Sequence, residues 1–350
     1  MITYPSPTVC LAHVAPVFLN PAATVDKACS LIQEAAQNGA DLIVFPESFL
    51  PGFPIWAALQ APINGHDLFK TMAANSVMIE GAEIAAICEA ARQNGIFVSL
   101  GFSEATKQSV GCLWNANLMI DDQGKILNHH RKLVPTYFEK MIWANGDGAG
   151  LKVNETRLGR IGMLICGENT NPLARYSLMA QGEQLHISSY PPIWPTRPLN
   201  HADGYNLESA IRIRAGAHSF EAKVFNVVVS ACVDDSMMKV VSTLGKEAEE
   251  IVEMSPRGVS MVIGPAGEVV SEIKSGEEGL LYHKINLEAC VEPKQFHDVV
   301  GYYNRFDVFN LQVNTQSQRP VEFLGENLRD GQNNLRSSGE AAKLSQLEGD

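Results

Sequence analysis

The stretch "RIGMLICGENTNPLARY", residues 160–176, changes character halfway along its length. An apolar run ends at Cys166, and a glycine, an acid and an amide follow at once. The run predicts a buried strand, and Pro172 after a cap at Thr170 or Asn171 predicts the start of a helix. Cys166 is therefore expected at a strand end ahead of a helix N-terminus, a position that can lower the pKa of a thiol. Most cysteines that end an apolar run are only buried, so this position alone is weak evidence of catalysis.

Strand and helix patterns alternate along the chain before this stretch. Residues 7–17 and 41–48 read as strands, and residues 21–40 between them read as a helix. Thr24 or Asp26 is expected to cap this helix. Its apolar stripe is expected to consist of Val25, Ala28, Ile32 and Ala35. A strand with apolar residues on both faces, such as 41–48, suits a sheet that is covered on both sides.

Hairpin patterns are mixed with this alternation. Residues 76–94 and 96–102 read as a second helix and strand, whereas 113–132 and 257–273 each read as two strands around a tight turn. Residues 279–290 are expected to supply a strand that closes the sheet. Hairpins among βα units predict a layered α/β sandwich with mixed sheets, in place of a purely parallel doubly wound fold.

The ends of the chain differ in composition. Residues 1–310 are expected to form one domain, and residues 311–350, rich in Gln, Asn, Ser, Gly and Glu, are expected to be a poorly ordered tail or an oligomer contact. Residues 234–255 are also expected to be less regular.

Composition excludes some classes of protein. The chain has 350 residues and a formal net charge of −12, which argues against nucleic-acid binding. No run of 18 or more apolar residues and no secretory signal pattern occurs, so we expect a cytoplasmic protein without a membrane partner. Its seven cysteines are scattered without a CxxC, so neither a disulfide framework nor a zinc site is expected.

Two further strand ends carry polar residues that a cysteine nucleophile could use. Glu47 follows the apolar run "LIVFP", where an unpaired carboxylate would be costly if buried. Lys132 follows the second strand of the hairpin at 113–132. A solvated acid and a surface lysine are the ordinary interpretations of such residues. Together with Cys166 they would supply a base, a cation and a nucleophile.

The residues around these three positions resemble a known family. "FPE" at 45–47, "HRKLVPT" at 130–136 with a downstream Glu139 and "GDG", and "ICGENTNPLARY" at 165–176 resemble the three motifs of the nitrilase branch of the carbon–nitrogen hydrolase superfamily. They occur in the family's order, and the resemblance spans about residues 5–310. Three motifs in order are more specific than any one of them.

The resemblance implies a fold and a mechanism. The fold would be a four-layer α-β-β-α sandwich, paired into homodimers that extend to higher homo-oligomers or spirals. Glu47, Lys132 and Cys166 would be the catalytic triad, and Glu139 would support Lys132 or position the substrate. An organic nitrile would be hydrolysed to the carboxylic acid and ammonia through a thioimidate and a thioester on the cysteine. No metal and no cofactor would be needed.

This sequence departs from the family pattern near the nucleophile and near the C-terminus. Gly167 stands where many nitrilases have a tryptophan, so we expect a larger or looser pocket there. Tyr302 and Phe306 replace a histidine and a proline of the family, although the aromatic segment is still expected to pack. In "SSYPPIWPTRPLN", Tyr190 and Trp194 are expected to line the pocket and to favour an apolar or aromatic nitrile.

Other interpretations remain at this point. The same triad would serve an amidase or an N-carbamoyl hydrolase, and the branch also suggests a cyanide hydrolase or an enzyme that stops at the amide. His129, His130 and His186 are interpreted as hydrogen-bonded strand or loop residues in place of a catalytic base, because no partner acid is evident. A non-enzymatic assembly protein on this scaffold is disfavoured by the intact triad.

Overall fold

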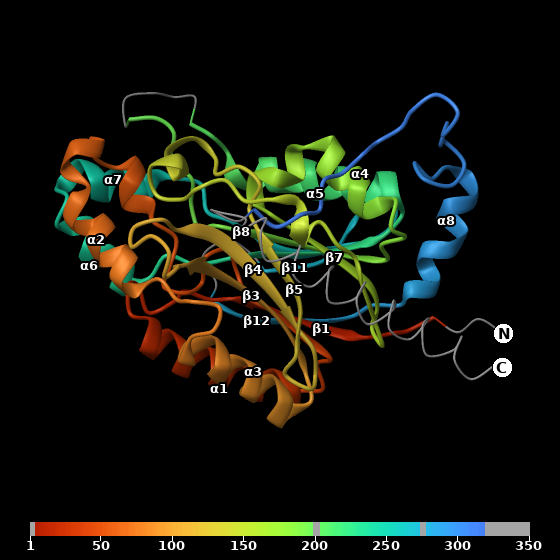
Figure 1. The fold of residues 1–350 in the computed structure, drawn as a ribbon, viewed down its shortest axis with the longest axis horizontal. Helices are drawn as coiled ribbons and strands as arrows, with labels where there is room; N and C mark the ends of the chain where they lie inside the picture. Colours follow the sequence, from red (N-terminus) through yellow and green to blue (C-terminus); the bar gives the residue numbers. More distant parts are fainter. Residues whose placement is uncertain (1–3, 199–203, 274–277, 319–350) are drawn as a thin grey trace, which may run out of the picture. The chain divides into compact units, whose positions relative to one another are not determined.

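The computed structural model describes residues 4–198, 204–273 and 278–318. The chain divides into two units, Met1–Gln316 and Ser317–Asp350, and every element below belongs to the first. Most of the expected tail, residues 319–350, lies outside the described residues. The first unit is built from two six-stranded sheets with helices on their outer faces (Figure 1).

The first sheet is mixed. Its strands are β1 (Thr8–His13), β2 (Leu42–Val44), β3 (Phe97–Glu104), β4 (Trp114–Ile120), β5 (Ile126–Arg131) and β12 (Gly279–Lys284). Their order is β12-β1-β2-β3-β4-β5. The strands β1, β2 and β3 run parallel, whereas β4, β5 and β12 join antiparallel. The predicted hairpin at 113–132 is confirmed, and so is the closing strand expected within 279–290, which covers Gly279–Lys284.

The second sheet is mixed as well. Its strands are β6 (Asn154–Thr156), β7 (Gly159–Ile165), β8 (Leu185–Tyr190), β9 (Phe225–Ser230), β10 (Ser260–Ile263) and β11 (Val269–Ile273). Their order is β11-β10-β9-β8-β7-β6, with β7, β8 and β9 parallel. The hairpin predicted at 257–273 is formed by β10 and β11.

The two sheets pack face to face, and each outer face is covered by helices. In β1, Val9 and Leu11 belong to the apolar core between the sheets, whereas Cys10 and Ala12 pack with helices. This alternation follows from the period of two residues in a strand. The helices α1 (Pro21–Gln37) and α3 (Ala82–Asn94) cover the first sheet, and α4 (Pro172–Met179) and α5 (Leu207–Ala222) cover the second (Figure 1). The four-layer α-β-β-α sandwich is therefore the fold of this protein.

Helix α1 shows what the sequence pattern did and did not predict. Its buried stripe contains the predicted Val25, Ala28, Ile32 and Ala35. The predicted cap at Thr24 or Asp26 is wrong, because the helix begins one turn earlier at Pro21. Asn20 caps it by accepting a hydrogen bond from the Ala23 amide. Proline is well suited to the first helical position, since it has no N–H to leave unpaired.

The prediction of irregular structure at 234–255 is wrong. The segment forms α6 (Asp235–Ser242) and α7 (Lys246–Met254), which pack with α2 (His66–Asn75) around one apolar cluster. Each helix contributes apolar residues four positions apart, which lie on one helical face. The remaining elements are α8 (Val291–Phe296) and the 3₁₀ turns η1 (Ile55–Ala58), η2 (Pro62–Asn64), η3 (Tyr137–Met141), η4 (Gly148–Gly150), η5 (Cys166–Thr170) and η6 (Leu287–Cys290).

The aromatic segment near the C-terminus is not packed as expected. Tyr302 and Phe306 are 72% and 66% exposed, and the apolar side chains next to them are exposed as well. The large exposed apolar side chains of this region are Phe296, Tyr302, Tyr303, Phe306, Val308 and Phe309. Among the described residues, no helix is long and apolar enough to span a membrane.

Candidate active site

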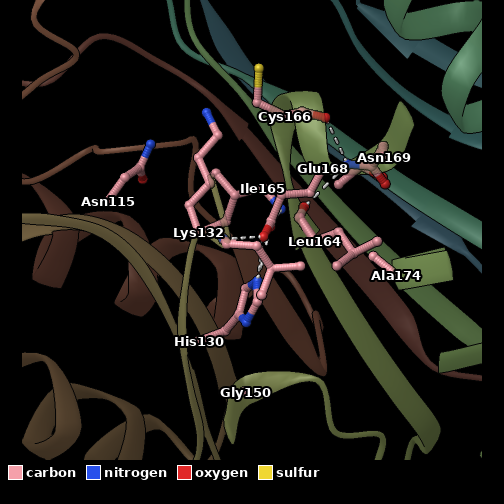
Figure 2. Close-up of polar contacts among 12 residues, drawn as sticks. Asn115, His130, Lys132, Gly150, Leu164, Ile165, Cys166, Glu168, Asn169 and Ala174 are labelled. Carbon is pink, nitrogen blue, oxygen red and sulfur yellow. Dashed lines mark hydrogen bonds and ion pairs between the residues drawn. The ribbon is translucent and has the colours of Figure 1, made fainter. Parts of the chain in front are cut away.

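Three polar side chains that follow the ends of different strands lie close together in the interior of the protein. Glu47 lies in the turn after β2, Lys132 directly follows β5, and Cys166 directly follows β7. The Lys132 Nζ lies 2.7 Å from Glu47 Oε1, and the Cys166 Sγ lies within 4.8 Å of a carboxylate oxygen of Glu47. All three side chains are buried. Figure 2 shows the thiol of Cys166 and the ammonium of Lys132 pointing to the same side, away from His130. The structure thus brings together the three residues that the motifs single out.

Glu139 completes this cluster. Its Oε2 accepts hydrogen bonds from Lys132 Nζ at 2.6 Å and from the Thr136 amide at 2.9 Å, where it forms a capping box at the start of η3. Its Oε1 accepts from the indole Nε1 of Trp194 at 3.3 Å. The ammonium of Lys132 therefore lies between two buried carboxylates, a geometry that fixes its position. Glu139 contacts Lys132 directly, as the resemblance implies for a supporting residue.

Asn115 is part of the site, although the sequence analysis missed it. It lies on β4, and its Nδ2 donates a 2.7 Å hydrogen bond to Glu47 Oε1. The sequence pattern that could have identified Asn115 is the pair of amides in "LWNANLMI", where Asn115 and Asn117 lie on one face of an otherwise apolar strand. A buried amide needs a partner, so this pair could have indicated a polar site.

The turn after β7 is held by Glu168 and Asn169. Cys166 has φ of 50°, in the left-handed region that is unfavourable for residues other than glycine. Glu168 accepts hydrogen bonds from the amides of Ile165 at 2.8 Å and Leu133 at 2.6 Å and also contacts His130 (Figure 2). Asn169 donates to the carbonyl oxygen of Cys166 at 3.1 Å. Both side chains therefore shape the turn.

The histidines before Lys132 are bonded to acids that the sequence analysis did not find. His129 contacts Glu104 at 2.8 Å, and His130 contacts Glu168 at 2.9 Å. Both histidines lie on β5 and are bonded through a ring nitrogen, so the prediction of hydrogen-bonded strand residues is confirmed for them. The partner acids come from β3 and η5, which are distant in the sequence.

Burial dominates the electrostatics of the cluster. Burial raises the pKa of Glu47 to about 7. The charge of Lys132 lowers this pKa, and the charge of Glu139 raises it. Burial and the Glu47 carboxylate raise the pKa of the Cys166 thiol well above its usual value. Burial would lower the pKa of Lys132, but Glu139 and Glu47 raise it above its usual value. The resting site thus contains a neutral thiol, a charged ammonium and a carboxylate that titrates near neutrality.

The expectation that a helix N-terminus lowers the pKa of this thiol is wrong. Cys166 is the first residue of the 3₁₀ turn η5, and α4 begins only after this turn, with Asn171 as its cap and Pro172 as its first residue. The thiol is therefore not in the first turn of an α-helix, where the effect is concentrated. Burial decides the direction of its pKa shift instead.

Two groups of described residues have donor atoms close enough together for a metal ion. These groups are Glu47 with Glu139 and Cys166, and Glu183 with His186 and His218. In the first, Lys132 already bonds both carboxylates. In the second, each carboxylate oxygen already bonds a histidine nitrogen. Both groups are therefore organised as hydrogen-bonded networks.

The three residues expected to contact the substrate do not lie together. Tyr190 and Trp194 pack in the same apolar cluster as Cys166, and the Tyr190 hydroxyl is buried. Gly167 instead lines a hollow of about 280 Å³ with residues 133–137, and Cys166 is not among the lining residues. A Cβ at Gly167 would lie 2.6 Å from the Thr136 Oγ1. Thr136 therefore occupies the space next to the Gly167 Cα, and the absence of a tryptophan ring at this position does not open the pocket there.

Comparison with known proteins agrees with this geometry. A model of the carbon–nitrogen hydrolase family matches residues 8–295. A nitrilase of Paraburkholderia phymatum is 32% identical over 311 residues, which cover 88% of this chain and 87% of that protein. An arylacetonitrilase of Aspergillus kawachii is 34% identical over 315 residues, which cover 89% of this chain and 93% of that protein.

Solved structures share the fold. The crystal structure of the C. elegans NitFhit protein has a TM-score of 0.66 at 18% identity and covers 92% of this chain and 71% of that chain. An amidase from Nesterenkonia sp. has a TM-score of 0.59 at 18% identity and covers 85% of this chain and 97% of that chain. By the family match and the identity to curated relatives, this chain belongs to the carbon–nitrogen hydrolase family, in its nitrilase branch.

Proposed function

We propose that this protein hydrolyses an organic nitrile to the carboxylic acid and ammonia, with Glu47, Lys132 and Cys166 as catalytic residues. The observation that carries the proposal is the unequal use of the two Glu47 oxygens. Oε1 accepts hydrogen bonds from Lys132 and Asn115, whereas the buried Oε2 has no partner among the described residues. With the Cys166 thiol nearby, one carboxylate oxygen is held in place and the other is available for a proton. Relatives named nitrilase and arylacetonitrilase support the nitrile as substrate.

The first half of the reaction forms a bond between sulfur and carbon. Glu47 removes the proton of the Cys166 thiol as the sulfur attacks the nitrile carbon, because the raised pKa of the thiol disfavours a free thiolate. The proton then passes to the nitrile nitrogen, which leaves a thioimidate and an ionised Glu47. The ammonium of Lys132 and the N–H groups that begin η5 stabilise the negative charge that develops on nitrogen.

The second half releases both products. Water adds to the thioimidate carbon with Glu47 as base, and the tetrahedral species expels ammonia to leave a thioester. A second water, deprotonated by Glu47, attacks the thioester and expels the sulfur, which recovers its proton. The sum is one nitrile and two waters giving one carboxylic acid and one ammonia. Glu139 acts by holding Lys132.

The apolar cluster at Cys166, the exposed aromatic segment and the free cysteines each support a further property. Tyr190 and Trp194 pack with Cys166 in an apolar cluster, which supports a substrate with an apolar or aromatic group. The exposed aromatic segment at 302–309 supports a homodimer that extends to a higher oligomer, because apolar patches of this kind are typical of interfaces. All seven cysteines are free, which supports a reducing compartment such as the cytoplasm.

Ammonia release tests the proposed reaction. Aliphatic nitriles, aromatic nitriles, arylacetonitriles and the matching amides are compared for the wild-type protein and for Cys166→Ala. Cys290→Ala is the matched control, because Cys290 is also buried but belongs to the core between the sheets. We expect nitriles to be turned over and Cys166→Ala alone to be inactive, with a covalent adduct on Cys166 detectable by mass spectrometry. Turnover of amides alone would move the protein to the amidase reaction, and an active Cys166→Ala would refute the nucleophile.

A further inference from the structure

A second buried polar network lies behind the nucleophile turn. Glu183, between α4 and β8, places one carboxylate oxygen 2.6 Å from His186 Nδ1 and the other 2.7 Å from His218 Nε2. The two imidazole rings stack with their centroids 3.7 Å apart. All three side chains are completely buried. The reaction proposed above uses none of them.

Asn169 joins this network to the nucleophile. Its Nδ2 donates to the carbonyl oxygens of Cys166 at 3.1 Å and Leu164 at 3.4 Å (Figure 2). Since both partners are pure acceptors, these contacts fix which end of the amide is nitrogen. The other end, Oδ1, is an acceptor and lies 3.0 Å from His186 Nε2. His186 must therefore carry a proton on Nε2.

The other ring nitrogen of His186 must carry a proton as well. Its partner is the Glu183 carboxylate, which also accepts from His218. Burial would raise the pKa of Glu183, but the charges of the two histidines and their hydrogen bonds lower it to about 2. The lowered pKa favours the ionised carboxylate, and each of its two oxygens faces one ring nitrogen as an acceptor. With an acceptor at each nitrogen, His186 satisfies both contacts only as an imidazolium.

His218, in contrast to His186, is a neutral ring. Its Nδ1 is buried and has no partner among the described residues, so one proton on Nε2 is sufficient to bond Glu183. Burial lowers the pKa of His218 to about 4, and the charge of His186 acts in the same direction. One charged ring and one neutral ring thus share one carboxylate, and the network as a whole has no net charge.

We propose that His186 is a positioning residue, a buried imidazolium that is neutralised by Glu183 and holds Asn169 against the backbone of Cys166. The proposal rests on Cys166 being the nucleophile of the proposed function. The left-handed φ of 50° at Cys166 persists only where surrounding contacts enforce it. Asn169 enforces it through the Cys166 carbonyl, and a charged donor holds Asn169 more strongly than a neutral one. Ser188 Oγ, 3.1 Å from the same Oδ1, is the only other contact of that oxygen among the described residues.

A metal ion is the competing explanation of this cluster. The donor atoms of Glu183, His186 and His218 lie within 4.8 Å of one another. Metal ligation would need unprotonated nitrogens facing the carboxylate. The two explanations therefore assign different protons to His186, and this difference can be measured.

The protonation state is tested directly by nitrogen-15 NMR of the histidine-labelled full-length protein near neutral pH. Spectra of His186→Gln and His218→Gln assign the two rings. We expect both nitrogens of His186 to have imidazolium shifts and His218 to be a neutral ring with one protonated nitrogen. A neutral His186 would overturn the proposal, and so would stoichiometric zinc or another transition metal found by elemental analysis of the same sample.

The positioning role is tested by the reactivity of Cys166, which needs no nitrile. The two variants each remove one histidine from the same carboxylate, but only His186 contacts Asn169. We expect iodoacetamide to alkylate Cys166 about 10- to 100-fold more slowly in His186→Gln and within about twofold of wild type in His218→Gln, because small misplacement of a reacting group is costly. The kcat for a nitrile should fall in parallel with little change in KM.

Each outcome of this experiment has a distinct meaning. Peptide mass spectrometry reports on Cys166 separately from the other six cysteines, and circular dichroism and Tm show whether each variant is folded. Equal alkylation rates in two folded variants would refute the positioning role alone. A Cys166→Ala variant that still releases ammonia from a nitrile would refute the nucleophile, and with it the proposed function. If His186→Gln does not fold, His218→Gln assigns His218, and the through-space contact between the two stacked rings then assigns His186 in the wild-type spectrum.

Discussion

The amide of Asn115 donates a 2.7 Å hydrogen bond to Glu47 Oε1. The same oxygen accepts from Lys132 at 2.7 Å, so the carboxylate is held from two sides and cannot rotate without breaking a bond. The second oxygen is left without a hydrogen-bond partner among the described residues, and a carboxylate oxygen of Glu47 lies within 4.8 Å of the Cys166 Sγ. The pKa of Glu47 is therefore set by the residues around it, and replacing each of these residues tests its contribution separately.

We expect kcat/KM of the wild-type enzyme to rise with pH through one ionisation near pH 7. Burial raises the pKa of Glu47 to about 7, and only the ionised carboxylate can take the thiol proton. Activity should therefore be lost as the pH falls through this value. A pH profile of kcat/KM for a good nitrile measures the position of this acid limb. A limb near the ordinary glutamate value of about 4.3 would contradict the assignment.

Asn115→Ala should move this acid limb to higher pH. The hydrogen bond from Asn115 stabilises the ionised form of Glu47 and lowers its pKa, so its loss raises the pKa further. A hydrogen bond to a charged group contributes about 1.5–3 kcal/mol, which corresponds to a shift of about one pH unit or more. Asn117→Ala is the matched control, because Asn117 lies on the same face of β4 but contacts Ser99. Equal shifts in both variants would show that the effect is not specific to Glu47.

Glu139→Gln should move the acid limb in the opposite direction. The charge of Glu139 raises the pKa of Glu47, so its removal lowers that pKa. At the same time kcat should fall about tenfold or more, because Lys132 loses the 2.6 Å contact that holds its ammonium in place. The pH profile and the plateau rate separate the two effects. A limb that moves upward, or an unchanged kcat, would refute the supporting role.

The parts of the site that the sequence predicts are those coded by local pattern. Cys166 and Glu47 each follow an apolar run that is visible in the sequence, and Lys132 follows the second strand of a predicted hairpin. The parts that it does not predict depend on contacts between distant segments. Asn115 bonds Glu47 across 68 positions, and Glu168 bonds His130 across 38. Gly167 was expected to open a pocket because the sequence does not show that Thr136 lies against it.

The fold, like the site, was predicted where local sequence patterns decide it and missed where contacts between distant segments decide it. Most strands of both sheets were visible as apolar runs or hairpins, because burial of one or both faces leaves a characteristic spacing of apolar residues, whereas the three-residue β6 was not predicted. The helices α6 and α7 were missed because each is only about two turns long and exposes most of its surface. Their apolar residues, Met237 with Val241 and Ala248 with Val252, become informative only when α2 is seen to pack with them.

Gly162→Ala should destabilise the protein. Gly162 lies on β7, and a Cβ there would overlap the Glu183 carboxylate that bonds His186. Overpacking of a buried site typically costs about 1–3 kcal/mol, and the displaced carboxylate is also part of a charged network. Gly279→Ala is the matched control, because Gly279 also lies in a strand but a Cβ there would meet no atom within 4 Å. Chemical denaturation of both variants measures the difference, and equal free energies of unfolding would contradict the expectation.

Trp194 should affect both substrate choice and the position of Glu139. Its ring stacks on Phe138 with centroids 5.3 Å apart, and its Nε1 donates to Glu139 Oε1 at 3.3 Å. Trp194→Ala removes the ring and the donor, whereas Trp194→Phe keeps a ring and removes only the donor. We expect Trp194→Ala to lower kcat/KM for phenylacetonitrile about 2- to 10-fold more than for an aliphatic nitrile, because aromatic contacts contribute about 0.5–1.5 kcal/mol. Trp194→Phe should keep the wild-type ranking of the two nitriles. If both variants lose activity equally on both substrates, Trp194 acts through Glu139 alone and does not select an aromatic group.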